Sequence, residues 1–138
     1  MFAPDGRWIA YYSDESGRNE IFVRPFPGPG GKWQISTAGG ITPTWSQKRH
    51  ELLYLAPDNR IMVTSYTVEG DSFKADKPLV WSEQAIQTVR RISRSFDLHP
   101  DGDRVAAAVL SNQTQLDKVT FIFNFFDELR RIAPPSKN

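Results

Sequence analysis

Only two side chains of this sequence, His50 and His99, have ordinary pKa values near neutral pH. A histidine acts as a general base when a nucleophile and an orienting partner lie beside it, often in a strained turn such as Gly-x-Ser-x-Gly. The sequence has no such turn, and the two histidines do not form a metal-binding pair of the His-Glu-x-x-His kind. We therefore expect both to be polar residues of turns or strand ends, and we predict no catalytic residue.

Acidic residues offer two further candidates for chemistry. Asp101 and Asp103 could act as an acid–base pair, but Asp101 belongs to a turn motif that already accounts for it. Asp14, Glu15 and Glu20 could form a calcium loop, although a solvated hairpin is the favoured interpretation. We therefore assign no metal site.

Glycine-rich stretches bind phosphate groups when a lysine, a serine or the start of a helix follows them. Residues 28–31 and 39–40 are rich in glycine but lack these additions. We expect both stretches to be loops, and we predict no cofactor.

Arg90, Arg91 and Arg94 form the one dense basic cluster of the sequence. Such a cluster could contact an acidic ligand or a phosphate group, and a solvated connection between repeats is the favoured alternative. The net charge of +1 gives no overall field that would attract nucleic acid, so no nucleic-acid partner is expected. The three arginines are the candidate interaction patch.

The element that must position these residues is a repeated hairpin. Pro4-Asp5-Gly6 and Pro100-Asp101-Gly102 each follow an apolar residue and one spacer, and each is followed by a charged residue and a predicted strand. The stretch 45–54 keeps the flanking apolar positions but has Gln47-Lys48-Arg49 in place of the motif. The copies are about 43 and about 53 residues apart, which is the spacing of four-stranded propeller blades.

The chemistry of the motif predicts its conformation. Proline fixes φ at the first central position of a turn, aspartate bonds its own backbone, and glycine takes the left-handed position without steric cost. In the middle copy Arg49 occupies the glycine position, so either this residue is strained or the loop has another shape. A related turn, Pro57-Asp58-Asn59, has an asparagine that tolerates the left-handed region.

Periodicity predicts an all-β chain, a partial propeller of about three four-stranded antiparallel blades that ends in a short helix. We expect a blade remnant over 1–37, a full blade over 38–82, a third blade over 93–125, and a helix and tail over 126–138. The strand over 7–13 is apolar on both sides and is expected to be buried on both faces. The outer strand of the full blade is expected over 72–81. Four tryptophans should pack between blades, namely Trp8, Trp33, Trp45 and Trp81.

Composition bounds the class of protein. A length of 138 residues with 39% hydrophobic residues is sufficient for a folded domain with a core. With no cysteine the chain has no disulfide and no thiolate metal site, and the redox compartment stays open. No apolar run is long enough to span a membrane, and no signal peptide is visible.

The hairpins resemble those of the TolB-like, WD-repeat-like β-propeller family, whose blades carry a Ser-Pro-Asp-Gly-like turn after the inner strand. Ala3-Pro4-Asp5-Gly6 and His99-Pro100-Asp101-Gly102 match this turn apart from the first residue. The stretches 17–27 and 124–129 are similar to the last blades of propellers fused to bacterial serine/threonine protein kinases. This resemblance implies a non-catalytic sensor or interaction module on the periplasmic or extracytoplasmic side, and it carries no kinase activity to this chain.

Three hypotheses for function follow. The leading one is a non-catalytic module that binds a protein or a small ligand. The alternative is the propeller portion of an enzyme such as an oligopeptidase-like serine hydrolase, with catalysis in another domain, and the proline-rich ending after Leu129 counts against it. The third is self-assembly, in which a second copy or upstream blades complete the ring, because an open arc exposes apolar end faces.

Overall fold

The computed structural model describes residues 1–86 and 95–107, and all ten elements in these residues are β-strands. The predicted all-β class is confirmed for this part of the chain. The expected helix and tail over 126–138, and the part of the expected third blade that follows residue 107, lie outside the described residues. Within the described residues there is no helix long and apolar enough to cross a membrane.

The first sheet contains β1 (Trp8–Ser13), β2 (Glu20–Pro25) and the short β3 (Trp33–Gln34), paired antiparallel in that order. Phe2 forms an isolated bridge with Ile9, on the side of β1 opposite β2. The polar turn between β1 and β2 closes with a 2.8 Å bond from the Gly17 amide to the Asp14 carbonyl. The first sheet is therefore a small antiparallel meander, as the alternation of apolar strands and polar turns predicts.

The second sheet contains β4 (Ile41–Trp45), β5 (Glu51–Leu55) and β6 (Ile61–Glu69), and its outer edge is formed by β7 (Ser72–Ala75) and β8 (Leu79–Ser82). Both outer strands pair antiparallel with β6, where we predicted one strand over 72–81. The register shows that residues 76–78 lie opposite only two residues of β6, Thr64 and Ser65. One extra residue makes a bulge, and Pro78 within it has no N–H for the ladder. This bulge divides the predicted strand.

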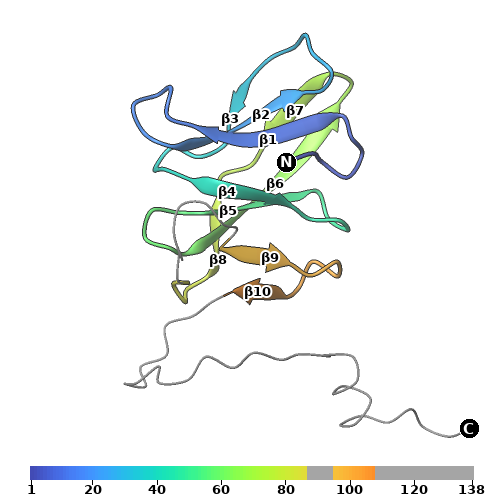
Figure 1. The fold of residues 1–138 in the computed structure, drawn as a ribbon. Helices are drawn as coiled ribbons and strands as arrows, with labels where there is room; N and C mark the ends of the chain where they lie inside the picture. Colours follow the sequence, from blue (N-terminus) through green and yellow to red (C-terminus); the bar gives the residue numbers. More distant parts are fainter. Residues whose placement is uncertain (87–94, 108–138) are drawn as a thin grey trace, which may run out of the picture.

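The third sheet is described only as a hairpin of β9 (Phe96–Leu98) and β10 (Val105–Ala107). The three sheets form three layers, in the order in which they occur along the chain (Figure 1). The segments 1–37 and 38–82 thus each contain one sheet, and the segment 93–125 contains this hairpin. That these sheets are blades of a propeller stays a prediction.

One hydrophobic core lies on each face of the second sheet. Side chains alternate along β5, so Leu52 and Tyr54 contact the first sheet while Leu53 and Leu55 face the third hairpin. The predicted packing of the tryptophans between layers is confirmed. Trp8 and Trp45 are 1% and 2% exposed, and Trp33 and Trp81 pack against the two cores while partly exposed.

The first and third hairpins, which share the Pro-Asp-Gly motif, also share the same backbone hydrogen bonds. The amide of Ala3 donates to the Trp8 carbonyl at 2.8 Å, and the amide of His99 donates to the Arg104 carbonyl at the same distance. The glycine amides of the two turns donate to the Ala3 and His99 carbonyls, each at 2.9 Å. Gly6 and Gly102 have φ of 69° and 80°, so the predicted left-handed glycine is confirmed in both copies.

The middle copy keeps the closing bond and changes the turn. The Ser46 amide donates to the Glu51 carbonyl at 3.0 Å, in the position of the Ala3–Trp8 bond. The Arg49 amide, however, donates to the Ser46 hydroxyl at 3.2 Å, and Arg49 does not adopt a positive φ. The second of the two predicted possibilities is therefore correct, because a serine side chain replaces the carbonyl acceptor and no left-handed residue is required. In the turn at 57–59, Asn59 has φ of 65°, as predicted.

The expectation that the first long strand is buried on both faces is wrong for β1. Trp8 and Ala10 are 1% and 0% exposed, whereas Ile9 and Tyr11 on the opposite face are only half-buried. β5, for which no such prediction was made, is buried on both faces because it has a layer on each side. The difference follows from position, because the first sheet lies at one end of the stack of three layers and the second sheet lies in its middle.

Candidate functional site

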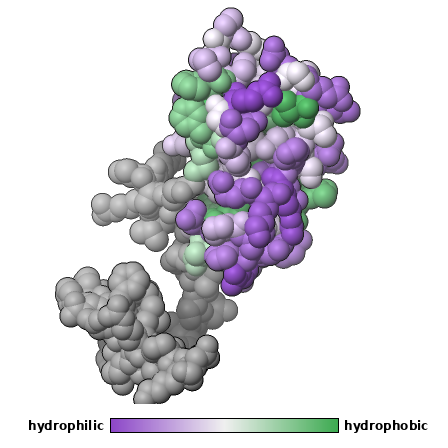
Figure 2. Space-filling model, turned by 90° about the vertical axis from the view of Figure 1, so that its right-hand side faces the viewer, coloured by the Kyte–Doolittle hydropathy of each residue, from purple (hydrophilic) through white to green (hydrophobic). Residues whose placement is uncertain are grey.

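Three hairpin turns lie at one end of the molecule, on the right in Figure 1. We call this the hairpin end and define it as turns 3–8, 46–51 and 99–104, with residues 70–71 of the β6–β7 turn. Figure 2 views the molecule from this side, and most of the surface there is hydrophilic. Loops that a rigid sheet scaffold holds together at one end are a common location for binding residues.

Arginine side chains connect neighbouring layers at the hairpin end. The Arg7 guanidinium in the first turn donates to the Gly70 carbonyl at 2.8 Å and lies 3.6 Å from the Asp71 carboxylate. Arg49 in the second turn forms an ion pair with Asp103 in the third. Each exposed pair contributes little stability by itself, yet together they fix the turns relative to one another.

The third hairpin holds a cluster of three ionisable side chains. The Arg104 guanidinium donates to the Asp101 carboxylate at 2.7 Å and lies 3.3 Å from both ring nitrogens of His99. The His99 Nδ1 atom is 2.9 Å from the Asp101 carboxylate. A hydrogen bond from the Asp103 amide, assisted by Arg104 and His99, lowers the pKa of Asp101. Asp101 is thus the anionic centre of the turn, and His99 is part of the turn, as the sequence predicted.

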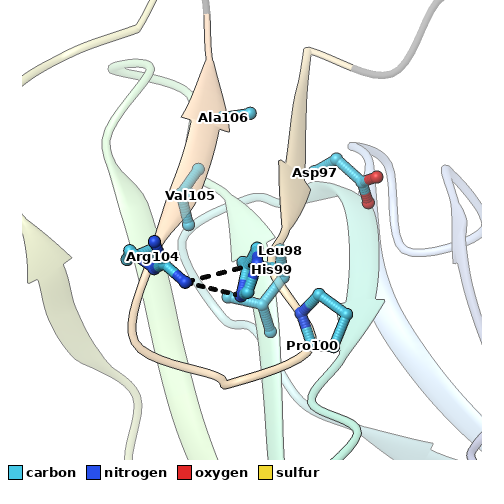
Figure 3. A pocket seen from close by; sticks show the side chains of 7 residues that line it. All are labelled: Asp97, Leu98, His99, Pro100, Arg104, Val105 and Ala106. Atoms are coloured by element: carbon cyan, nitrogen blue, oxygen red, sulfur yellow. Dashed lines mark hydrogen bonds between the residues drawn. The ribbon is translucent and has the colours of Figure 1, made fainter. Parts of the chain in front are cut away.

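A cavity of about 310 Å³ opens beside this cluster. Figure 3 shows that the side chains around it come from β9, β10 and the turn that joins them. The cavity combines an apolar wall with a guanidinium and an imidazole at one end, and its lining residues are Asp97, Leu98, His99, Pro100, Arg104, Val105 and Ala106. The charged and polar groups of the cavity are the Asp97 carboxylate, the His99 imidazole and the Arg104 guanidinium, which can form hydrogen bonds with a bound group.

The other histidine also has a packing role. The His50 ring stacks on the Tyr66 ring with centroids 5.3 Å apart, and the His50 carbonyl accepts a 2.9 Å bond from the Tyr66 amide. Tyr66 in turn stacks on Phe73 within the first core. His50 therefore covers the end of an aromatic cluster.

The opposite end of the molecule contains a buried carboxylate. Glu20 is only 1% exposed, and it accepts hydrogen bonds from the Ser36 hydroxyl, from Arg18 Nε at 2.6 Å and from the Gly39 amide at 3.0 Å. Burial alone would raise the pKa of Glu20, and these hydrogen bonds with the Arg18 charge outweigh burial, so the pKa is lower than its usual value. The network fixes the connection between the first and second sheets.

The candidate calcium loop has a different structure from the one that a metal would need. Glu15 pairs with Lys32 at 2.8 Å, and Glu20 is buried against Arg18. Across residues 1–86 and 95–107, no three side chains of His, Cys, Asp or Glu are grouped so that they could hold a metal ion. Arg90, Arg91 and Arg94 lie outside the described residues, so the predicted patch stays a prediction.

Sequence reasoning missed two features. The buried position of Glu20 has one weak signal, namely that Glu20 directly precedes the apolar run 21–23 of a strand. The cavity has no local signal, because it depends on which layer covers β9 and β10. Comparisons with known protein families, with curated proteins and with solved structures found no match to this chain.

Proposed function

We propose that this chain is a non-catalytic binding module that forms part of a β-propeller of the TolB-like kind. The observation that carries the proposal is the stack of three antiparallel layers, each with a hairpin that closes by the same hydrogen bond. Propellers are built in this way, from repeated four-stranded sheets whose corresponding turns lie at one end. The second sheet, with β7 and β8 as one interrupted outer strand, has the four strands of such a blade.

The binding surface in this proposal is the hairpin end. The ionisable side chains of the third turn pair with one another, and His50 packs on Tyr66, which are arrangements that hold a surface rather than activate a nucleophile. Lys48 is exposed and belongs to the second of the three turns at this end. The candidate patch of Arg90, Arg91 and Arg94 is a second proposed contact, and the kinase-type resemblance supports a sensor role on the extracytoplasmic side.

Site-specific photo-crosslinking tests the proposal. A benzophenone side chain replaces Lys48 at the hairpin end, and the matched control replaces Glu15 in the β1–β2 turn at the opposite end. We expect a discrete adduct in the producing cells from position 48, none from position 15, and loss of the adduct when Arg49→Glu is added. Equal adducts from both positions, or none from position 48, would contradict the hairpin end as the binding surface.

A further inference from the structure

The second sheet packs against the first sheet through a certain set of positions in the repeat. The first sheet presents the same set of positions on its outer face. The hydrogen bonds that close the first two hairpins align the two repeats residue by residue. In this alignment three pairs of positions are equivalent, namely Phe2 and Trp45, Ile9 and Leu52, and Tyr11 and Tyr54. The three residues of the second sheet are 2%, 0% and 4% exposed in the first core. Their equivalents in the first sheet are half-buried or, for Phe2, 51% exposed.

The exposed part of this face is aromatic. The Phe2 ring packs edge-on against the Phe26 ring, with centroids 4.8 Å apart, and Phe26 is itself 49% exposed. Two neighbouring aromatic side chains that are each about half exposed to solvent form an apolar patch, and such patches mark contact surfaces.

The cavity of the third hairpin repeats the site that receives Trp45. Superposing the first and third hairpins makes Met1 equivalent to Asp97, Trp8 to Arg104, and Ala10 to Ala106. In the first layer, the Trp45 indole donates to the Met1 carbonyl at 3.0 Å and shares a core with Trp8 and Ala10. In the third layer, the equivalent residues line the cavity of about 310 Å³ (Figure 3).

Size and chemistry agree with an aromatic guest. At about 310 Å³ the cavity, which is open to solvent, has room for one aromatic ring, since benzene fits a closed cavity of about 150 Å³. Ala106 is exposed on the cavity side, and Arg104 replaces Trp8 with a guanidinium, which also stacks on aromatic rings.

We propose that this cavity receives Phe2 of a second copy, so that copies of the chain associate head to tail. The outer face of the first sheet would pack on the outer face of the β9–β10 hairpin and repeat, between molecules, the contact seen between the first and second sheets. Because the two surfaces differ, the contact is heterologous, and it closes into a ring or extends into a chain of copies. The inference goes beyond the proposed function, since it requires only the observed contact between layers.

Sedimentation equilibrium of the full 138-residue chain over a hundredfold range of concentration tests the inference. We expect concentration-dependent association of the unaltered chain. Phe2→Asp and Ala106→Arg should each raise the concentration needed for association at least tenfold, while circular dichroism stays unchanged because both positions are exposed. The matched control Tyr12→Ser removes another exposed aromatic residue of the first sheet, on the opposite face of β1, and should leave association unchanged.

Mixing the two variants gives the sharpest result. The Phe2→Asp chain keeps its cavity and the Ala106→Arg chain keeps Phe2, so an equimolar mixture should form a one-to-one complex that cannot grow further. A strictly monomeric unaltered chain would overturn the inference. Undiminished association of Ala106→Arg alone would also overturn it, because that result indicates a symmetric contact between two Phe2 faces. Neither outcome affects the crosslinking experiment at Lys48, which tests the proposed function separately.

Discussion

Gly40 lies where the connection between the first two sheets passes against the core. A Cβ atom there would lie 2.8 Å from Ile21 Cγ1, 2.9 Å from Tyr54 Cδ2 and 3.1 Å from the Ser36 hydroxyl. Such distances require several buried groups to move, since protein cores are close-packed. Glycine at this position is therefore required by packing rather than by its backbone conformation.

We predict that Gly40→Ala lowers the free energy of unfolding by about 1–3 kcal/mol, the usual cost of overpacking. The matched control is Gly28→Ala, whose Cβ would meet only an arginine side chain, at 3.8 Å. Urea denaturation of both variants measures the difference, and equal stabilities would show that the core tolerates the extra methyl group.

Thr44 presents a polar atom to the interior. Its side chain is 3% exposed, and its hydroxyl has no hydrogen-bond partner among the described residues. An unpaired buried hydroxyl costs free energy, because the hydration that it loses is not replaced.

We predict that Thr44→Val leaves the free energy of unfolding unchanged or raises it by up to about 1 kcal/mol, because the unpaired hydroxyl is removed. Thr44→Ser keeps the hydroxyl and loses a methyl group, so it should lower the free energy of unfolding by about 1 kcal/mol. Denaturation of the two variants side by side decides the question. The opposite order would mean that the hydroxyl has a partner in solution.

At the scale of the element, the two Pro-Asp-Gly hairpins have the same bonds in different surroundings. A Cβ at Gly6 would have no atom within 4 Å, whereas a Cβ at Gly102 would lie 3.1 Å from the Ser46 hydroxyl of the neighbouring turn. A substitution at Gly6 therefore measures only the backbone cost of a left-handed residue. A substitution at Gly102 also disturbs a contact between layers.

We predict that Gly6→Ala lowers the free energy of unfolding by about 1–2 kcal/mol, which is the cost of a left-handed conformation for an L-residue. Gly102→Ala should cost more, because the Ser46 hydroxyl must also move. Asn59→Gly serves as a control with the same backbone conformation, and it should have no cost or a small stabilising effect. A larger loss at Gly6 than at Gly102 would contradict the role given to the neighbouring turn.

At the scale of the whole molecule, the layers are held by two cores and by a polar network at each end. Arg7 and Arg49 connect neighbouring layers at the hairpin end. At the opposite end, Arg18 donates to both Glu20 and the Thr37 carbonyl, so the buried carboxylate ties the connecting segment to the first sheet. Tyr54 lies near this network, and burial together with the Glu20 charge raises its pKa to about 12.

We predict that Glu20→Gln lowers the free energy of unfolding at pH 7 by about 1–3 kcal/mol, because hydrogen bonds to a buried charge are lost. The pKa of Glu20 is lower in the folded state than its usual value of 4.5. Its contribution is therefore complete above about pH 4.5 and is lost as pH falls through the folded-state pKa. Urea denaturation between pH 3 and pH 7 should show a weaker acid loss in Glu20→Gln than in the unaltered chain.

The control for this prediction is Glu15→Gln. Glu15 makes an exposed ion pair with Lys32, so its loss should change stability by less than about 1 kcal/mol. An unchanged acid dependence in Glu20→Gln would show that other carboxylates, such as Asp101, dominate the acid response.

Several elements could be predicted because their signals are local. The Pro-Asp-Gly turns, the left-handed Asn59 and the strands of the second sheet depend on neighbouring residues and on alternation along the chain. The division of the outer strand was missed because a one-residue bulge leaves the apolar pattern nearly intact. The three candidate arginines lie outside the described residues, so their role stays a prediction.

The sequence by itself determined the all-β class, the turn types and the repeat spacing, because backbone conformation near proline, glycine and asparagine is set by local sterics. Only the tertiary structure decided which equivalent positions are covered. Phe2 and Trp45 occupy the same place in the repeat, yet one is 51% and the other 2% exposed. Burial depends on whether a neighbouring layer is present, and no pattern within a single repeat encodes that.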